Sequence, residues 1–147
     1  MKNLITDVTV TENVSLITLK QVENRHGVLA YIFGLLRNAG IDVDMISQSY
    51  PAKETVELSF TISDEQISDL VSLLAGHKDL KASVFSGNTK ISFFGKGMEN
   101  QPGVAAYVFE LFAKAECDIK MVNTSTCDIS CLIAPEYAAK IKELFNE

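Results

Sequence analysis

The chain has 147 residues, of which 47% are hydrophobic and 22% charged, as is typical of a globular protein with one or two small domains. Its net charge of −6 argues against partners such as nucleic acid or an anionic membrane surface, because both attract clustered Lys and Arg. The longest apolar run, residues 28–36, is too short to span a membrane, and Asp7 interrupts any signal-peptide core. The sequence therefore predicts a cytoplasmic protein.

The first half of the chain alternates between strand and helix patterns. Apolar residues two apart indicate strands, and a single stripe at helical spacing between Gly27 and Gly40 indicates an amphipathic helix. A turn is expected at Glu12-Asn13, and Ser63 is placed to cap a second helix. In chain order, the sequence predicts strands over 3–11 and 14–20, a helix over 28–39, strands over 41–49 and 55–62, a helix from Ser63 to Gly76, and a strand over 80–86.

Residues 27–49 recur without a gap as residues 103–125, which is 76 positions later. Ten of the 23 paired positions are identical, so the chain is a duplicated module. The second copy repeats the order of elements. It has a strand over 90–94, a helix from Gly103 to about Ala115, strands near 117–124 and 127–133, and a final helix over 135–145.

Each copy reads βαββα and needs one more strand to complete a four-stranded ferredoxin-like sheet. The first copy finds that strand at 80–86, but the second reaches the end of the chain without one. Because residues 4–10 correspond to 80–86 in the repeat, we expect the N-terminal strand to complete the second sheet. The predicted fold is α+β, with two βαββαβ domains whose four-stranded antiparallel sheets carry helices on one face. The predicted domains are residues 14–86 and residues 3–11 plus 88–147.

Motifs for catalysis or metal binding are missing from the sequence. Cys117, Cys127 and Cys131 lack the CxxC spacing of a zinc site, and neither His26 nor His77 lies near them in sequence. The two histidines fit no Ser-His-Asp or Cys-His arrangement, and the glycines at 95 and 97 are too few for a phosphate loop. We therefore predict no metal site, no cofactor and no catalytic residues, and expect the cysteines to be reduced thiols in a core or an interface.

With this architecture, the chain resembles a tandem pair of ACT domains, and more closely the C-terminal regulatory region of aspartokinase. In the first copy the resemblance rests on Gly27-Val28, Ile32-Phe33 and Ala39–Ser49. In the second it rests on KISFFGKGMENQPGVAAYVFE (90–110), Ser125 and Ile129–Ile133. The two modules leave no room for a kinase domain, so the chain is expected not to be an enzyme by itself. It is either a stand-alone regulatory protein or the regulatory part of an aspartokinase.

The resemblance implies a free amino acid as ligand, lysine or threonine, bound at an interface between ACT domains. The helix that begins after Gly27 offers unpaired N–H groups for a carboxylate, and Asp42 and Asp44 offer carboxylates for an ammonium group. The residues expected to contact the ligand are Arg25, His26, Gly27, Val28, Leu29, Asp42, Val43, Asp44, Gln48 and Ser49 in the first copy, and Asp118, Ile119 and Ser125 in the second.

Both copies depart from the family pattern. In the first copy His26 stands where a proline is usual; in the second, Cys117-Asp118 stand where glycine or asparagine types are usual and Lys120 stands where an acid is common. Because the Lys120 charge would repel an ammonium group, we expect the first copy to bind the ligand and the second to be largely structural. Alternative interpretations remain open, because Gly27 can simply permit a tight turn and the two aspartates can be solvated surface charges. Three functions follow: an amino-acid sensor that forms a homodimer and can act on an aspartokinase catalytic chain, a ligand-free dimerisation module, or a small enzyme on a ferredoxin-like frame.

Overall fold

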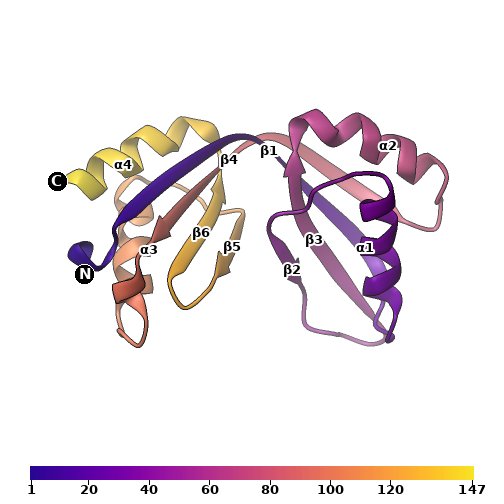
Figure 1. Cartoon of the computed structure of the whole chain (residues 1–147), viewed down its shortest axis with the longest axis horizontal. Coiled ribbons are helices and arrows are strands. Elements are labelled where there is room, and N and C mark those ends of the chain that lie inside the picture. Colours follow the sequence, from indigo (N-terminus) through magenta and orange to yellow (C-terminus); the bar gives the residue numbers. More distant parts are fainter. The chain divides into compact units, whose positions relative to one another are not determined.

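The fold is built on two long strands, β1 (Asp7–Glu23) and β4 (Lys81–Phe94), shown in Figure 1. The computed structural model describes all 147 residues and divides into two units. One unit is Asn13–Ser86, and the other is Met1–Glu12 together with Gly87–Glu147. Each long strand supplies one part to each unit.

The unit Asn13–Ser86 is a four-stranded sheet with the strand order β2-β3-β1-β4. Both β1 and β2 pair with β3 in antiparallel register. The helices α1 and α2 pack on this sheet through Ile32, Leu36 and Leu70, which share one core cluster with residues of β1 and β3 (Figure 1). Its remaining elements are α1 (Val28–Asn38), β2 (Ile46–Gln48), β3 (Thr55–Ser63), a short 3-10 turn (Asp64–Gln66) and α2 (Ile67–Ala75).

The ends of these helices follow from their sequence. Gly27 and Gly40 flank α1 with φ of 89° and 72°, a left-handed conformation that glycine adopts without steric cost. The hydroxyl of Ser63 accepts the N–H of Glu65 at 3.3 Å, which confirms the predicted cap at the start of the second helical segment.

The second unit repeats the arrangement with the strand order β1-β4-β6-β5. Here β1 contributes its N-terminal part, and just before it the Thr6 N–H donates to the Phe94 carbonyl at 2.8 Å. The N-terminal strand therefore completes the second sheet, and the predicted fold class is confirmed. The remaining helices and strands of this unit are α3 (Val104–Lys114), β5 (Met121–Thr124), β6 (Asp128–Ile133) and α4 (Ala138–Asn146).

The structure corrects the predicted turn at Glu12-Asn13, because β1 continues through it as a single strand. Asn13 takes a left-handed φ of 58°, which asparagine tolerates better than most residues, so the chain can bend there without leaving the strand. Similarly, the two strands expected at 80–86 and 90–94 are one strand, β4, with Gly87 at φ 73°.

Two predicted strands are shorter in the structure than in the sequence pattern. Within 41–49 only Ile46–Gln48 forms a strand, and within 117–124 only Met121–Thr124 does. In the first case the backbone of residues 42–45 is held by irregular bonds, since Asp42 N–H donates to the Gln66 side chain and Met45 N–H to the Thr61 hydroxyl. The apolar residues of this segment therefore still alternate, although its backbone does not form a regular β-ladder.

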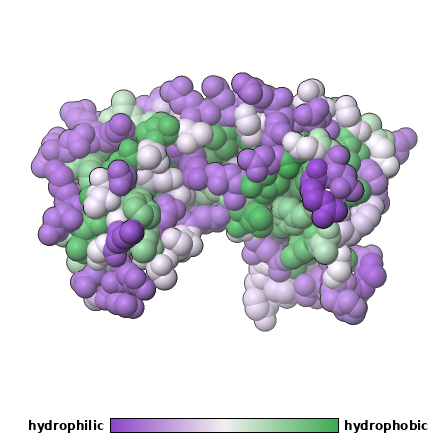
Figure 2. All heavy atoms as spheres, viewed as in Figure 1, coloured by the Kyte–Doolittle hydropathy of each residue, from purple (hydrophilic) through white to green (hydrophobic).

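Hydrophilic residues cover much of the surface visible in Figure 2, with apolar residues (green) gathered in patches within each unit. Among large hydrophobic side chains, Tyr50 and Phe85 are the most exposed, at 89% and 65%. None of the helices combines the length and the apolar character needed to cross a membrane.

Candidate functional site

A cavity of about 300 Å³ lies where β1 leads into α1, in the unit Asn13–Ser86. Its walls come from the end of β1, the loop, the first turn of α1, the strand β2 and the start of β3. The lining residues are Glu23, Asn24, Arg25, His26, Gly27, Leu29, Gln48 and Val56.

The start of α1 faces this cavity without a capping side chain. Gly27 occupies the N-cap position at φ 89° and ψ −17°, and no side chain accepts from the first N–H groups of the helix. A Cβ on Gly27 would meet no atom within 4 Å, so the glycine is needed for its backbone conformation and not for space. The Val28 N–H donates to the Arg25 carbonyl at 3.2 Å, so it is the remaining N–H groups of the first turn, together with the helix dipole, that favour an anion such as a carboxylate at this position.

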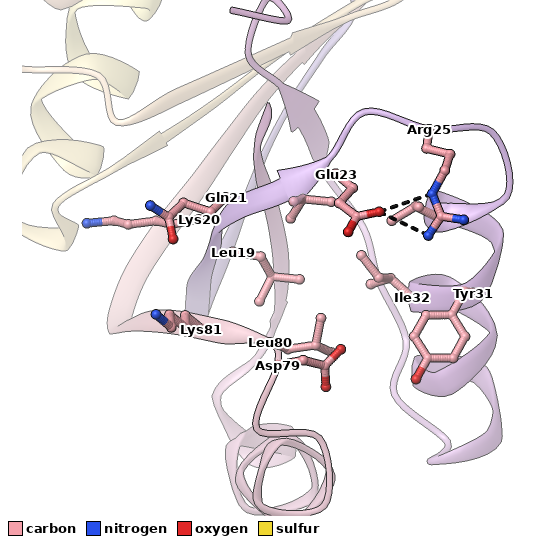
Figure 3. A pocket seen from close by; sticks show the side chains of 12 residues that line it. Leu19, Lys20, Gln21, Glu23, Arg25, Tyr31, Ile32, Asp79, Leu80 and Lys81 are labelled. Atoms are coloured by element: carbon pink, nitrogen blue, oxygen red, sulfur yellow. Dashed lines mark hydrogen bonds and ion pairs between the residues drawn. The ribbon is translucent and has the colours of Figure 1, made fainter. Parts of the chain in front are cut away.

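Arg25 supplies a positive charge at the same place. Its Nε and Nη2 atoms both lie 3.0 Å from the Glu23 Oε2 atom, as the dashed lines in Figure 3 show. Both side chains are about two-thirds exposed, at 68% and 66%, so solvent screens the pair and it contributes little to stability. An incoming carboxylate can therefore compete with Glu23 for the guanidinium group.

Five of the predicted contact residues meet in this cavity: Arg25, His26, Gly27, Leu29 and Gln48. Val28 lines an adjoining cavity of about 280 Å³ together with three of the same loop residues. Ser49 lies next to Gln48, but its hydroxyl accepts the Glu57 N–H at 2.8 Å and it lines neither cavity.

The predicted acidic residues lie elsewhere in the same unit. Asp42 and Asp44 are exposed on the segment that follows the other end of α1, and Val43 between them is partly buried against the core. The Asp42 N–H donates to the Gln66 side chain at 3.0 Å, and the Asp44 N–H donates to the Thr61 carbonyl at 3.1 Å. Because α1 has 11 residues and rises about 1.5 Å per residue, its two ends are roughly 16 Å apart. One chain therefore does not bring Asp42 to the Arg25 loop.

The predicted residues of the second copy belong to the other unit and have partners within it. The Ser125 hydroxyl accepts the Cys127 N–H at 3.2 Å, and the Ile119 side chain packs against the core. Asp118 is exposed, and its carbonyl accepts from the Cys117 thiol at 3.3 Å. The Lys120 ammonium group donates to the Asn88 side chain, so this lysine has a partner within its own unit.

Glu23, Asn24 and Val56 also line the cavity, although they are not among the contact residues predicted from the sequence. A signal for two of them was present, because Glu23-Asn24 recurs as Glu99-Asn100 just ahead of the second repeat. No sequence pattern pointed to Val56, whose place at the cavity depends on the pairing of β3 with Val22 in β1.

Comparison with known proteins gives the family. A model of the ACT domain matches residues 20–77 and 91–143, one match in each unit. The aspartokinase of Geobacillus stearothermophilus is 35% identical over 136 residues, which are 92% of this chain and 33% of that protein. An aspartokinase of Helicobacter pylori is 34% identical over 137 residues, 92% of this chain and 34% of its own length. The chain thus spans about a third of the length of these curated relatives.

Solved structures of nearly equal length are also similar. The ligand-free regulatory subunit of aspartate kinase from Thermus thermophilus has a TM-score of 0.88 and 27% identity, with 97% of each chain covered. A structure of aspartokinase alpha and beta subunits has a TM-score of 0.81 and 28% identity, covering 97% of this chain and 99% of that one. The chain belongs to the ACT domain family, and its pair of ACT domains resembles the regulatory subunit of aspartate kinase along nearly its whole length.

Proposed function

We propose that this chain is an amino-acid-sensing regulatory module of an aspartokinase, with lysine or threonine as the effector. The observation that carries the proposal is the cavity at the start of α1, where an uncapped helix N-terminus, Arg25 and Gln48 converge. The similarity to regulatory subunits of aspartate kinase supports a regulatory role over an enzymatic one.

The effector lies with its α-carboxylate at the N–H groups of the first turn of α1, next to the Arg25 guanidinium. Hydrogen bonds to a charged group contribute roughly 1.5–3 kcal/mol each, so this contact anchors the ligand. The carbon atoms of the effector side chain lie against Leu29 and Val56, and the Gln48 amide offers both a donor and an acceptor.

The only carboxylate that lines the cavity of one chain, Glu23, is paired with Arg25, so the ammonium group requires a further acid. We infer that a second copy supplies it, because β2 is the outermost strand of its sheet and its outer edge is open to pairing. Antiparallel pairing of two β2 strands about a two-fold axis at Ser47 puts Asp44 of the partner subunit opposite Tyr50, two positions beyond Gln48. The site is then completed in a homodimer, with Asp44 as the ammonium acceptor.

The regulated partner is an aspartokinase catalytic chain. The curated relatives are about three times as long as this chain, and the solved structure of aspartokinase alpha and beta subunits contains a chain of matching extent. We propose that the module acts on such a catalytic chain, either as a separate subunit or as part of the same polypeptide.

A thermal-shift screen of the full chain against the 20 amino acids tests this function. A ligand present at 100 times its dissociation constant stabilises the folded state by about 2.7 kcal/mol, which corresponds to a rise in melting temperature of roughly 5 °C or more for a chain of this size. The Arg25→Ala variant should lose this rise, while Arg37→Ala, which removes an exposed arginine near the other end of α1, should keep it. If no amino acid raises the melting temperature, the proposal is contradicted and the alternative function, a ligand-free dimerisation module, is favoured.

A further inference from the structure

We propose that Gln66 is a positioning residue for effector binding, because its side chain fixes the segment that carries Asp44, the ammonium acceptor. The inference rests on the proposed function and adds a residue that lines neither cavity at the β1–α1 loop. Gln66 ends the short 3-10 turn Asp64–Gln66, which leads from β3 into α2 within the unit Asn13–Ser86.

The Gln66 amide bonds at two points to the segment that follows α1. Its Nε2 atom donates to the Gly40 carbonyl at 2.8 Å, and its Oε1 atom accepts the Asp42 N–H at 3.0 Å. A glutamine side chain can make both bonds because its amide carries a donor and an acceptor side by side. This pair of hydrogen bonds, the Gln66 clamp, holds the backbone on both sides of Ile41.

The clamped segment has no regular ladder of its own. Since β2 begins only at Ile46, residues 41–45 depend on individual hydrogen bonds. The Asp44 N–H donates to the Thr61 carbonyl at 3.1 Å, and the Met45 N–H donates to the Thr61 hydroxyl at 2.9 Å. The backbone of this segment is therefore fixed from β3 at Asp44 itself and from the 3-10 turn two residues earlier. The carboxylate of Asp44 is exposed, so its position depends on this backbone.

A fixed position matters for the interaction proposed for Asp44. A charge-assisted hydrogen bond to an ammonium group depends on the distance and angle between donor and acceptor. If the segment had to become ordered when the effector binds, the lost conformational entropy would reduce the affinity. The Gln66 clamp orders it in advance, and so raises the affinity through Asp44 without contact to the effector.

The second ACT domain has neither the clamp nor the acid. In the repeat, the 3-10 turn Asp64–Gln66 corresponds to Pro135–Tyr137, so a tyrosine stands in place of the glutamine. The side chain of Tyr137 packs against the core of its unit. Asp44 corresponds to Lys120, which cannot accept an ammonium group. The clamp is therefore found in the copy that carries the acid.

The clamp is not needed to end the helix. Gly40 and Glu116 follow α1 and α3 with similar left-handed φ angles of 72° and 54°. The next N–H groups, of Ile41 and Cys117, donate back into the preceding helix at 2.9 and 3.0 Å. Both helices thus end in the same way, although only the first has the glutamine. This comparison favours a role in holding Asp44 over a role in terminating α1.

Calorimetric titration of the full chain with L-lysine and with L-threonine tests the inference. Gln66→Met keeps the length of the side chain and loses both hydrogen bonds, so it should weaken effector binding about three- to tenfold. In the Asp44→Asn background the same substitution should cost little further affinity, because the clamp acts through Asp44. Without ligand, amide hydrogen exchange at Asp44 should be faster in Gln66→Met than in the wild type.

Ser63→Ala is the matched control, because it removes the hydroxyl that accepts the Glu65 N–H in the same 3-10 turn. It should lower the stability and leave both the affinity and the exchange at Asp44 as in the wild type. If Gln66→Met behaves in the same way, Gln66 is purely structural and the inference is overturned. Equal losses of affinity from Gln66→Met with and without Asp44→Asn would also overturn it. A wild type that binds neither amino acid would overturn the proposed function and this inference together, whereas equal binding by the wild type and Gln66→Met would overturn the inference alone.

Discussion

Substitution of Gly95 by alanine should destabilise the second ACT domain, because the new Cβ would collide with the backbone of the N-terminal segment. A Cβ at this position would lie 1.9 Å from the Leu4 carbonyl oxygen, and ordinary contact begins at 3.4 Å, so the two segments must separate by about 1.5 Å. The three nearest atoms, the Leu4 carbonyl oxygen and carbon and the Ile5 Cα, all belong to the backbone, so they cannot rotate away as a flexible side chain could. The N-terminal segment must therefore move off the sheet.

The size of the effect follows from what this segment contributes. The hydrogen bond from the Thr6 N–H to the Phe94 carbonyl, 2.8 Å long, is worth about 0.5–1.5 kcal/mol. Ile5, which is 6% exposed and belongs to the core of the second unit, loses part of a burial worth about 1.5–3 kcal/mol. We expect Gly95→Ala to lower the free energy of unfolding by about 2–4 kcal/mol.

Urea denaturation followed by circular dichroism measures this loss. The matched control is Gly34→Ala inside α1, where the nearest atom to a new Cβ is the Arg37 Nη2 atom at 3.9 Å. There the substitution should be stabilising by about 0.5–1 kcal/mol, because alanine favours the helix more than glycine does. If Gly95→Ala is as stable as the wild type to within about 0.5 kcal/mol, the close packing of Leu4 on Gly95 is refuted.

Three further results are expected. Deletion of residues 1–11 should remove hydrogen-exchange protection from residues 90–133 while 14–86 stay protected, because it takes a strand from the second sheet only; loss in the reverse pattern would contradict the strand order. Burial raises the pKa of the Cys131 thiol to about 12 and that of Cys117 above its usual value, so Ellman's reagent at pH 8 should titrate only Cys127 quickly, and three fast thiols would be inconsistent with this core. Sedimentation velocity should show a homodimer that Ile46→Lys dissociates by placing like charges at the open β2 edge, and a wild-type monomer at micromolar concentration would rule out the dimer.

Most of the architecture could be predicted because the repeat supplied its own alignment. The pairing of residues 4–10 with 80–86 in that alignment indicated which sheet lacked a strand, and the structure places β1 there. The prediction of a turn at Glu12-Asn13 was wrong because polar residues that are typical of turns can also lie in a strand that bends. Asn13, with its left-handed φ, lies at such a bend in β1.

The candidate site was harder to predict than the fold. Residues next to each other in the loop, from Arg25 to Leu29, could be grouped from sequence because a helix start presents them together. Asp42 and Asp44 were grouped with them by resemblance, yet in one chain they follow the far end of α1. Whether a second copy brings an aspartate to the Arg25 loop depends on dimerisation, which no local sequence pattern indicates. The tight contact between Gly95 and Leu4 was likewise invisible, since it joins segments 91 positions apart.

Calorimetric titration of the wild type and of Asp44→Asn with lysine and with threonine tests the central claim most directly. We expect one of the two amino acids to bind the wild type, and the Asp44→Asn variant to bind it about ten- to a hundredfold more weakly, because an ammonium group loses a charged acceptor. Lys120→Asp, which changes a charge in the second domain, should bind as the wild type does. Wild-type affinity in Asp44→Asn would place the ammonium group elsewhere, and the absence of binding heat with both amino acids would contradict an effector site for either of them in this chain.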